Sequence, residues 1–394
     1  MSRLSKEGSA IDIIDDDTVV RELAAPFLSS GGPSRDVVVE EIGDGNLNMV
    51  FRVRGGDDSV IVKMAPPYLR AAGDAWPLTQ DRIRIEAEAL RIHGDLAPGQ
   101  VPELLHCDTE RAAMVLEDLR AHTVWRAALI EGRHVAGVAE RIGRYCARTL
   151  IGSSDLAMSP GKRKSMSSRF VNIELCAITE ELVFTAPYVD AETNRWDPAA
   201  AGLAASLRAD LPMRRAAARL RWEFRSRCEA LIHGDLHTGS VMVADGDARV
   251  IDLEFAFFGP MAYDTGNVLA NLAFASIAHQ ERGNDAFARQ ITEYAQGFWN
   301  ALYDEARLIW PTNEPWNEIF ISDLLRDSAR YAATELVRRI VGLAHVADID
   351  SLADGPRLRA QRRAVSGARS LALGPPVRSL NDLWNRATQE EISA

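Results

Sequence analysis

Apolar and polar residues alternate along the first third of the chain and recur every three to four positions along most of the remainder. Alternation with a period of two predicts strands at 37–42, 49–53 and 59–64. A short amphipathic helix is expected before them, at 18–28. The segment 43–48, Gly-Asp-Gly-Asn-Leu-Asn, joins the first two strands and predicts a hairpin turn.

The tip of this hairpin carries two glycines. Glycine lets backbone amides approach phosphate oxygens closely, so the tip is a candidate phosphate-binding element. The alternative is an ordinary hairpin turn, because glycine and asparagine are common turn residues. The candidate nucleotide-binding residues of the tip are Gly43, Gly45 and Asn46.

The third predicted strand contains a lysine, Lys63, among apolar neighbours, and a predicted helix follows at 79–92. In nucleotide-binding lobes such a lysine holds the α and β phosphates and pairs with a glutamate of the next helix. Glu86 lies early in the predicted helix and is the expected partner, with Glu88 as the alternative. Alone, Lys63 would be a solvated strand end; hairpin, lysine and glutamate in this order favour a nucleotide site.

Residues 112–119 predict a strand that runs into an acidic turn. In a two-lobed kinase such a segment joins the lobes, and its backbone reads the adenine edge. We therefore expect the Glu117 carbonyl and the Leu119 amide to contact the base. Beyond residue 120 the apolar period approaches 3.6, which predicts helices, among them an arginine-rich amphipathic helix at 210–227 and a solvated basic helix at 357–369. The basic segment 162–165 is expected in a solvated loop between helices. The expected divisions are a leader with a helix at 1–30, a sheet-containing N-lobe at 31–119 and a helical C-lobe at 120–394.

Composition narrows the class of protein. A chain of 394 residues with 47% hydrophobic residues can bury two lobes. The formal net charge of −11 argues against a nucleic-acid or anionic-membrane partner. The four cysteines lie far apart without metal-ligand spacing, which indicates free thiols in a reducing cytosol. No window approaches the roughly 18 apolar residues of a membrane span, so a cytoplasmic protein is expected.

Two short apolar runs, at 230–232 and 250–251, each lead to acidic residues. Phosphoryl transfer from a metal-bound nucleotide needs one carboxylate at the substrate hydroxyl and another at the cation. Asp235 is the candidate that accepts or orients the hydroxyl proton. Asp252 and Glu254 are the candidate metal ligands, because residues i and i+2 of an extended strand face the same side. The alternative for Asp252 is a turn cap.

Ser240 stands five residues after the catalytic aspartate, where protein kinases carry a metal-binding asparagine. A hydroxyl binds magnesium less strongly than an amide oxygen, so more of the metal binding is expected from the two later carboxylates. His233 and His237 are expected to hold the loop by hydrogen bonds. There is no arginine before the aspartate, no Asp-Phe-Gly and no Ala-Pro-Glu motif. The parts that couple activation-loop phosphorylation to protein-kinase activity are therefore absent, and a small-molecule hydroxyl is the better target.

Six stretches carry a resemblance to a known family: 43–48, 76–82, 174–185, 233–240, 255–261 and 338–345. Through them the chain resembles the methylthioribose kinase family, small-molecule kinases related to aminoglycoside and choline phosphotransferases, from Glu41 to Asp350. The family usually has Asp-Pro-Glu where this chain has Asp252-Leu253-Glu254, so only local backbone rigidity is expected to differ.

The resemblance implies an α+β, protein-kinase-like bilobal fold with an antiparallel-sheet N-lobe and a mainly helical C-lobe. It implies ATP and Mg²⁺ as cofactors and 5-methylthioribose as substrate. The anomeric hydroxyl would be phosphorylated to the 1-phosphate in methionine salvage. The family also implies a homodimer.

The paired arginines of that family correspond to Arg338 and Arg339. A predicted helix runs through them, with an apolar seam from Leu325 to Leu343. From the residues alone both arginines would be solvated. The resemblance assigns them, with Asp235, to the sugar hydroxyls and the transferred phosphate. It likewise makes Trp76 a lid residue near the sugar, whereas its position before a proline in a predicted polar loop also allows a packing anchor.

Two rival functions remain open. A kinase for a related 5-deoxypentose is the nearest, because a pocket discriminates weakly against small changes in an apolar group. A catalytically silent nucleotide-binding regulator belongs to a different class. The joint presence of Lys63, Asp235, Asp252 and Glu254 argues against it.

Overall fold

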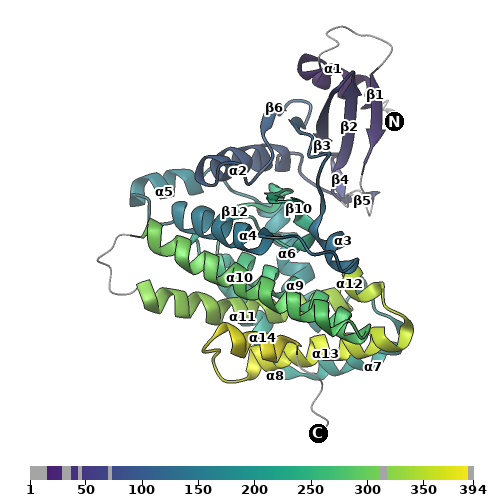
Figure 1. Cartoon of the computed structure of the whole chain (residues 1–394), viewed down its shortest axis with the longest axis vertical. Helices are drawn as coiled ribbons and strands as arrows, with labels where there is room; N and C mark the ends of the chain where they lie inside the picture. Colours follow the sequence, from purple (N-terminus) through teal and green to yellow (C-terminus); the bar gives the residue numbers. More distant parts are fainter. Residues whose placement is uncertain (1–15, 29–36, 43–46, 70–72, 311–316, 389–394) are drawn as a thin grey trace, which may run out of the picture. The chain divides into compact units, whose positions relative to one another are not determined.

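A computed structural model of the chain describes residues 16–28, 37–42, 47–69, 73–310 and 317–388 (Figure 1). The chain forms two compact units. The first comprises Met1–Ile83 and Glu103–Asp118, and the second comprises Arg84–Pro102 and Leu119–Ala394. An antiparallel sheet dominates the first unit and helices dominate the second, which confirms the expected α+β class.

The first unit is built on a five-stranded antiparallel sheet of order β1-β2-β3-β7-β6. Its strands are β1 Val38–Glu41, β2 Met49–Gly55, β3 Asp58–Met64, β6 Leu104–Asp108 and β7 Ala113–Glu117. The sequence predicted all of them except β6. Residues of β6 are only partly buried or exposed, so its side chains do not alternate clearly between apolar and polar.

Helix α1, Asp16–Ala24, covers one face of this sheet and is followed by a short 3₁₀ turn, Ala25–Phe27. Val20 and Leu23 of the helix pack against Val60 and Val62 of β3. Side chains alternate between the faces of a strand, so Lys63 lies on the face opposite Val62. Lys63 is nonetheless buried.

The segment between β3 and the next helix forms a small hairpin. Its strands are β4, Tyr68–Leu69, and β5, Gly73–Pro77. Trp76, expected in a loop, lies on β5 and is half-buried. The expectation of a loop was wrong because backbone pairing with β4, which the sequence does not show, orders this segment.

Arg82 anchors the entry to helix α2, Arg82–Leu96. Its guanidinium is fully buried and donates to the Asn48 side chain at 2.8 Å and to the Pro66 carbonyl at 2.7 Å. It also donates to the carbonyls of Leu47 and Thr79. One side chain therefore fixes the end of the β1–β2 turn and the entry to the helix.

Replacing Arg82 with alanine should lower the free energy of unfolding by about 2–4 kcal/mol, because several buried oxygens would lose their donor. Urea unfolding followed by circular dichroism measures this change. Arg91→Ala, at an exposed position of the same helix, is the matched control and should stay within about 0.5 kcal/mol of wild type. Equal losses in the two variants would contradict the anchoring role.

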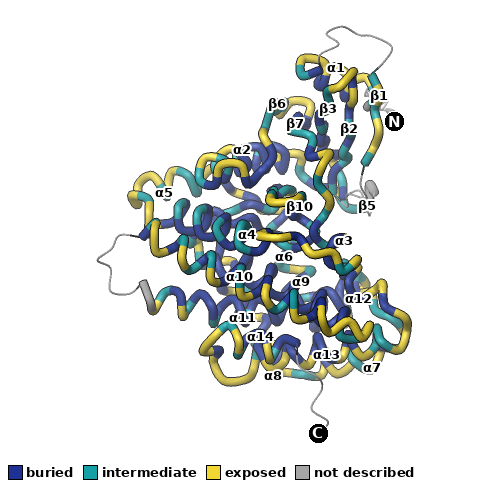
Figure 2. Tube along the Cα trace, viewed as in Figure 1, coloured by how far each residue is buried: buried dark blue, intermediate teal, exposed yellow. Residues whose placement is uncertain are grey.

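Helix α9 is the central element of the second unit. Every residue from Met261 to His279 is buried, and the helix packs against α10, α11 and α13 (Figure 2). Gly266 allows α11 to approach closely, since a Cβ there would lie 2.6 Å from the Ser328 carbonyl oxygen. The helices of the unit after α2 are α3 Trp125–Ile130, α4 Val138–Cys146, α5 Pro160–Ser167, α6 Ile173–Phe184, α7 Ala201–Ala209, α8 Leu211–Ser226, α9 Met261–Glu281, α10 Asp285–Ile309, α11 Asn317–Val341, α12 Ala347–Asp350, α13 Asp354–Leu373 and α14 Leu380–Thr388.

Three expectations for this unit need correction or limits. The basic segment 162–165, expected in a loop, lies in α5. The segment 357–369, expected to be solvated, lies in α13, where Arg363 and its apolar neighbours are buried against other helices. The seam predicted around the paired arginines is buried from Leu325 to Ile340, but α11 ends at Val341, and Leu343 beyond it is only partly buried.

Two small sheets carry the loops that follow the two apolar runs. Strand β9, Ala230–Ile232, pairs with β12, Phe257–Gly259. Strand β10, Val241–Ala244, pairs with β11, Asp247–Val250, and with β8, Thr123–Val124. The pairing brings the loop after β9 and the segment before β12 to one side of the unit. Among the described helices, none is long and apolar enough to cross a membrane.

Candidate active site

The loop 233–240, which follows β9, is held from below by Asp264 in the first turn of α9. The Asp264 carboxylate accepts the backbone N–H groups of His233 at 2.7 Å and Gly234 at 3.0 Å. Gly234 has φ of +85°, and a Cβ there would lie 2.3 Å from the Phe255 carbonyl oxygen, so only glycine fits. Burial raises the pKa of Asp264 to about 6. Nothing in the sequence distinguishes Asp264 from an ordinary acidic residue at a helix start.

The two histidines of the loop make its internal hydrogen bonds, as expected. His233 Nδ1 accepts the Asp235 N–H at 3.2 Å, and Nε2 donates to the Ile251 carbonyl at 2.8 Å. His237 Nδ1 accepts the N–H groups of Gly239 and Ser240 at 3.0 and 3.1 Å. Each imidazole is therefore assigned as the neutral Nε2–H tautomer. Burial lowers the pKa of His237 to about 4, although Asp235 opposes the shift.

Ser240 closes the loop on itself. Its hydroxyl accepts the His237 N–H at 2.9 Å and lies 2.9 and 3.1 Å from the carbonyl oxygens of His237 and Asp235. The side chain is buried, and its proton is donated within the loop. Ser240 thus stabilises the loop, and its expected part in metal binding stays a prediction.

Asp235 projects from this loop with 30% of its side chain exposed. Its Oδ1 accepts Arg338 Nη2 at 3.0 Å, and its Oδ2 lies 3.4 Å from His237 Nε2. Burial works against the charge of Asp235, but His237, Arg338 and Arg339 outweigh it and hold the pKa of this carboxyl well below its usual range. Asp235 is therefore ionised at neutral pH.

Glu335 fixes both members of the arginine pair. It is fully buried in α11, accepts Arg339 Nε at 2.8 Å with one oxygen, and pairs with Arg338 Nε through the other. Burial alone would raise the pKa of Glu335, but the two guanidinium groups lower it to about 2. Both arginines are buried as a result, so the solvated alternative was wrong. The signal for Glu335 was present in the sequence as an acid three and four positions before two arginines of a helix.

The segment after β11 is not the extended strand that the sequence predicted. The Ile251 N–H donates to the Ser240 carbonyl at 3.0 Å, and the chain then turns through Asp252, which has φ of +65°. A 3₁₀ turn, Leu253–Phe255, follows. The argument that residues i and i+2 share a strand face therefore fails. The Asp252 side chain makes no capping hydrogen bond, so the turn-cap alternative has no support either.

Asp252 and Glu254 nevertheless offer the kind of donors that a hard cation needs. Asp252 is exposed, and Glu254 is buried with its carbonyl held by Asn172 Nδ2 at 2.8 Å. Among the described residues, no group of three or more acidic, histidine or cysteine side chains could hold a metal ion unaided. Magnesium in kinase sites commonly takes one or two carboxylates, with phosphates and water completing the shell. The two carboxylates fit that pattern.

Residues 38–309 match the phosphotransferase enzyme family. A methylthioribose kinase from Yersinia enterocolitica is 40% identical over 385 residues, covering 93% of this chain and 96% of the relative. One from Yersinia pseudotuberculosis is 42% identical over 371 residues, covering 90% of this chain and 91% of the relative. A solved choline kinase from Cryptosporidium parvum has a TM-score of 0.48 at 11% identity, covering 95% of this chain and 94% of that chain.

The chain belongs to the phosphotransferase enzyme family and, by its relatives, to the methylthioribose kinases. The resemblance seen in the sequence is thereby confirmed. Membership implies that this phosphotransferase uses ATP with a divalent metal ion and acts on a small-molecule sugar.

The expected nucleotide-binding residues of this phosphotransferase are divided between its two units. Lys63 is buried on β3 in the first unit, and Glu86 is buried on α2 in the second unit. Their pairing stays a prediction. Glu88, the alternative partner, is already paired with Arg84 at 3.3 Å and Arg169 at 2.9 Å, which favours Glu86. Glu117 ends β7, Leu119 follows it, and Gly43, Gly45 and Asn46 lie outside the described residues.

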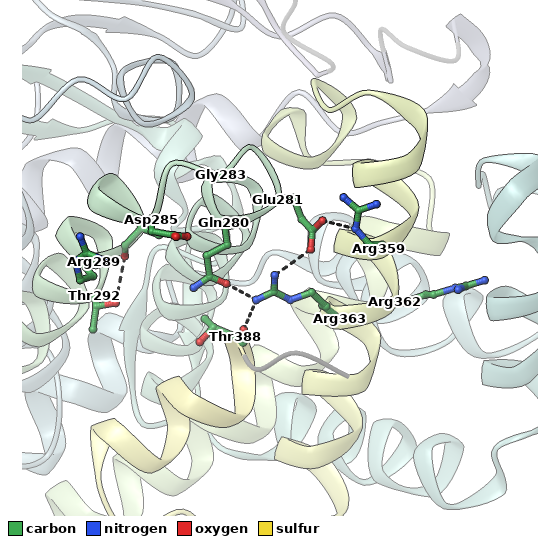
Figure 3. Close-up of a pocket in the computed structure, with 11 residues that line it drawn as sticks. Gln280, Glu281, Gly283, Asp285, Arg289, Thr292, Arg359, Arg362, Arg363 and Thr388 are labelled. Carbon is green, nitrogen blue, oxygen red and sulfur yellow. Dashed lines mark hydrogen bonds and ion pairs between the residues drawn. The ribbon is translucent and has the colours of Figure 1, made fainter. Parts of the chain in front are cut away.

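A hollow of about 980 Å³ lies where α9 ends and α10 begins, beside α13 and α14 (Figure 3). Glu281 in its wall pairs with Arg359 at 2.7 Å and with Arg363 at 3.0 Å. Asp264 and Glu281 are separated by about 25 Å along the axis of α9, so the hollow is distinct from the loop around Asp235. Glu281 thus pairs with two of the arginines that line the hollow, which contributes no group to the candidate site.

Replacing Glu335 with glutamine should destabilise this phosphotransferase in a pH-dependent way. The folded pKa of about 2 lies below the ordinary value of 4.5. The stabilisation is therefore present above pH 4.5 and is lost as the pH falls toward 2, with a full value of about 3 kcal/mol. Melting temperatures of wild type and Glu335→Gln, compared from pH 7 down to 3.5, measure it. The gap should narrow on acidification; a gap independent of pH would contradict the ion-pair account.

Proposed function

We propose that this chain is an ATP-dependent kinase that phosphorylates the anomeric hydroxyl of 5-methylthioribose and yields 5-methylthioribose 1-phosphate. One observation carries the proposal: an ionised aspartate in a fixed loop is joined to a buried arginine pair that one glutamate aligns. Relatives named methylthioribose kinase at 40–42% identity supply the substrate class.

Asp235 orients the sugar hydroxyl and receives its proton as the oxygen attacks the γ-phosphorus. A new O–P bond forms, the bond from the γ-phosphorus to the bridging oxygen of ATP breaks, and ADP leaves. Because the pKa of Asp235 is held low, orientation is its main contribution and the proton passes on to solvent. Arg338 and Arg339 bind the sugar hydroxyls and balance charge on the transferred phosphoryl group.

Cofactor binding follows from the same proposal. Asp252 and Glu254 would hold Mg²⁺, with the Ser240 hydroxyl as a third, weaker contact. Magnesium neutralises the phosphates of ATP when bound. The proposed nucleotide contacts are Gly43, Gly45 and Asn46 at the hairpin tip, Lys63 with Glu86, the Glu117 carbonyl and the Leu119 amide.

The proposal assigns nucleotide binding to residues 31–119, after a leader at 1–30, and the sugar site to residues 120–394, with Trp76 as a lid over the sugar. The resemblance supports a homodimer acting in methionine salvage. Four cysteines without a disulfide support a cytoplasmic location.

The purified protein should phosphorylate methylthioribose with a kcat/KM at least tenfold above that for 5-deoxyribose, the substrate of the nearest rival. A coupled ADP assay gives the rates, and ³¹P NMR of the product identifies a 1-phosphate. A tenfold preference for 5-deoxyribose would transfer the assignment to a 5-deoxypentose kinase. Asp235→Ala should abolish product formation, and an unchanged rate would refute the catalytic assignment.

Arg339→Ala should lower kcat by about two orders of magnitude, the scale of losing one contact to transition-state charge. Arg338→Ala should lower it at least as much, because Arg338 also binds Asp235 directly. Arg326→Ala, on the same helix and half-buried, is the control, because among the described residues Arg326 forms an ion pair only with Asp323. Normal turnover in Arg339→Ala would make that arginine a structural partner of Glu335 only.

A further inference from the structure

A third arginine, Arg126, lies beside the catalytic loop, and the proposed reaction assigns it no role. It comes from the first turn of α3, and its side chain is only 16% exposed. Its Nε donates to Thr238 Oγ1 at 3.2 Å, and Thr238 opens the 3₁₀ turn that ends at Ser240. A Cβ at Gly239 would lie 2.8 Å from Arg126 Nη1, so the guanidinium lies against the loop backbone.

Arg126 is itself fixed from the other side. Its Nη2 donates to Asn271 Oδ1 at 2.7 Å, and its Nε lies 3.4 Å from Asp348 Oδ2. Asp348 is buried, and neither of its carboxylate oxygens has a hydrogen-bond partner among the described residues. It therefore balances the arginine through charge. Such an arrangement costs desolvation free energy on both groups, which a fold that needed only packing could avoid with apolar residues.

Asn271 connects Arg126 to Glu335, the carboxylate that holds the arginine pair. Its Oδ1 accepts Arg126, and its Nδ2 donates to Glu335 Oε1 at 3.2 Å, the same oxygen that holds Arg339. The amide is fully buried in α9, so its two ends are fixed by these partners. A continuous series of contacts thus runs from the catalytic loop to the carboxylate that aligns the arginine pair.

We propose that Arg126 is a positioning residue for Asp235, tied through Asn271 to the arginine pair. Asp235 is held on one side by Arg338 and on the other by a loop that Arg126 holds through Thr238. These contacts fix the position of the catalytic loop relative to Arg338 and Arg339. The Asp235 carboxylate and the two guanidinium groups can then contact the sugar at the same time. The inference rests on the proposed kinase activity, because turnover is one of its readouts.

Thr238 offers a matched test. Thr238→Val keeps the shape of the side chain and removes the acceptor for Arg126, whereas Thr238→Ser keeps the hydroxyl. We expect Thr238→Val and Arg126→Met each to lower kcat tenfold or more, with KM for sugar and ATP within about threefold of wild type. Thr238→Ser should restore most of the rate. The double variant should lose little beyond Arg126→Met alone, because both changes break one contact.

Arg133→Met is the control, because Arg133 lies just beyond α3, is largely exposed and should not change kcat. Equal rates in Thr238→Val and Thr238→Ser would overturn the inference. So would a rise in KM at unchanged kcat, which would make Arg126 a substrate contact. A rate loss that matches a loss of folded protein in thermal melts would also overturn it.

A second readout is independent of turnover. Selective ¹⁵N labelling of histidine reports the two imidazole nitrogens of His237, which lies in the turn that Arg126 holds. These signals should shift in Arg126→Met and Thr238→Val and stay unchanged in Arg133→Met. If wild type failed to phosphorylate methylthioribose, the proposed function would fail while this measurement still tested the positioning role. Unchanged signals in Arg126→Met would refute that role.

Discussion

The candidate site depends on one buried carboxylate placed between two guanidinium groups. Removing three ionised groups from water costs several kcal/mol per group, and the interior recovers this only where the pairing geometry is good. Glu335 meets that condition, with one oxygen for each arginine. The ion pair also orients the Arg338 guanidinium, because Nε is bound to Glu335 and Nη2 therefore points to Asp235. Loss of Glu335 would leave Arg338 with Asp235 as its remaining ion-pair partner and would remove the carboxylate that pairs with Arg339.

Helix α9 is the rigid support on which this arrangement is assembled. Asp264 and Asn271 are seven residues apart, about two helical turns, and therefore share one face. Asp264 holds the start of the catalytic loop. Asn271 joins Glu335, which aligns the arginine pair, to Arg126, which holds the end of the same loop. Burying a polar side chain on a buried helix costs free energy unless it is hydrogen-bonded, and both Asp264 and Asn271 are. Gly266, between them, brings α11 close enough for Glu335 to reach Asn271.

The sequence predicted most of what depends on local periodicity and on short motifs. Four of the five strands of the first sheet, α8 and the loop around Asp235 follow from residues close in the chain. The misses have a common physical origin, because they depend on contacts between distant residues. Strand β5 exists because β4 pairs with it, and Asp252 turns because Ile251 is held by Ser240. Asp264, Asn271 and Arg126 acquire roles only through partners more than 25 positions away.

Six ionised side chains beside the loop carry balanced charges, because the carboxylates of Asp235, Glu335 and Asp348 match the guanidinium groups of Arg126, Arg338 and Arg339. Asp264, which binds the loop backbone, lies outside this set. Such a set projects little field beyond its own dimensions. Encounter with an uncharged sugar then depends on shape and hydrogen bonding, without long-range electrostatic attraction. The charges become effective only at contact, where water has been displaced and each dipole is already oriented.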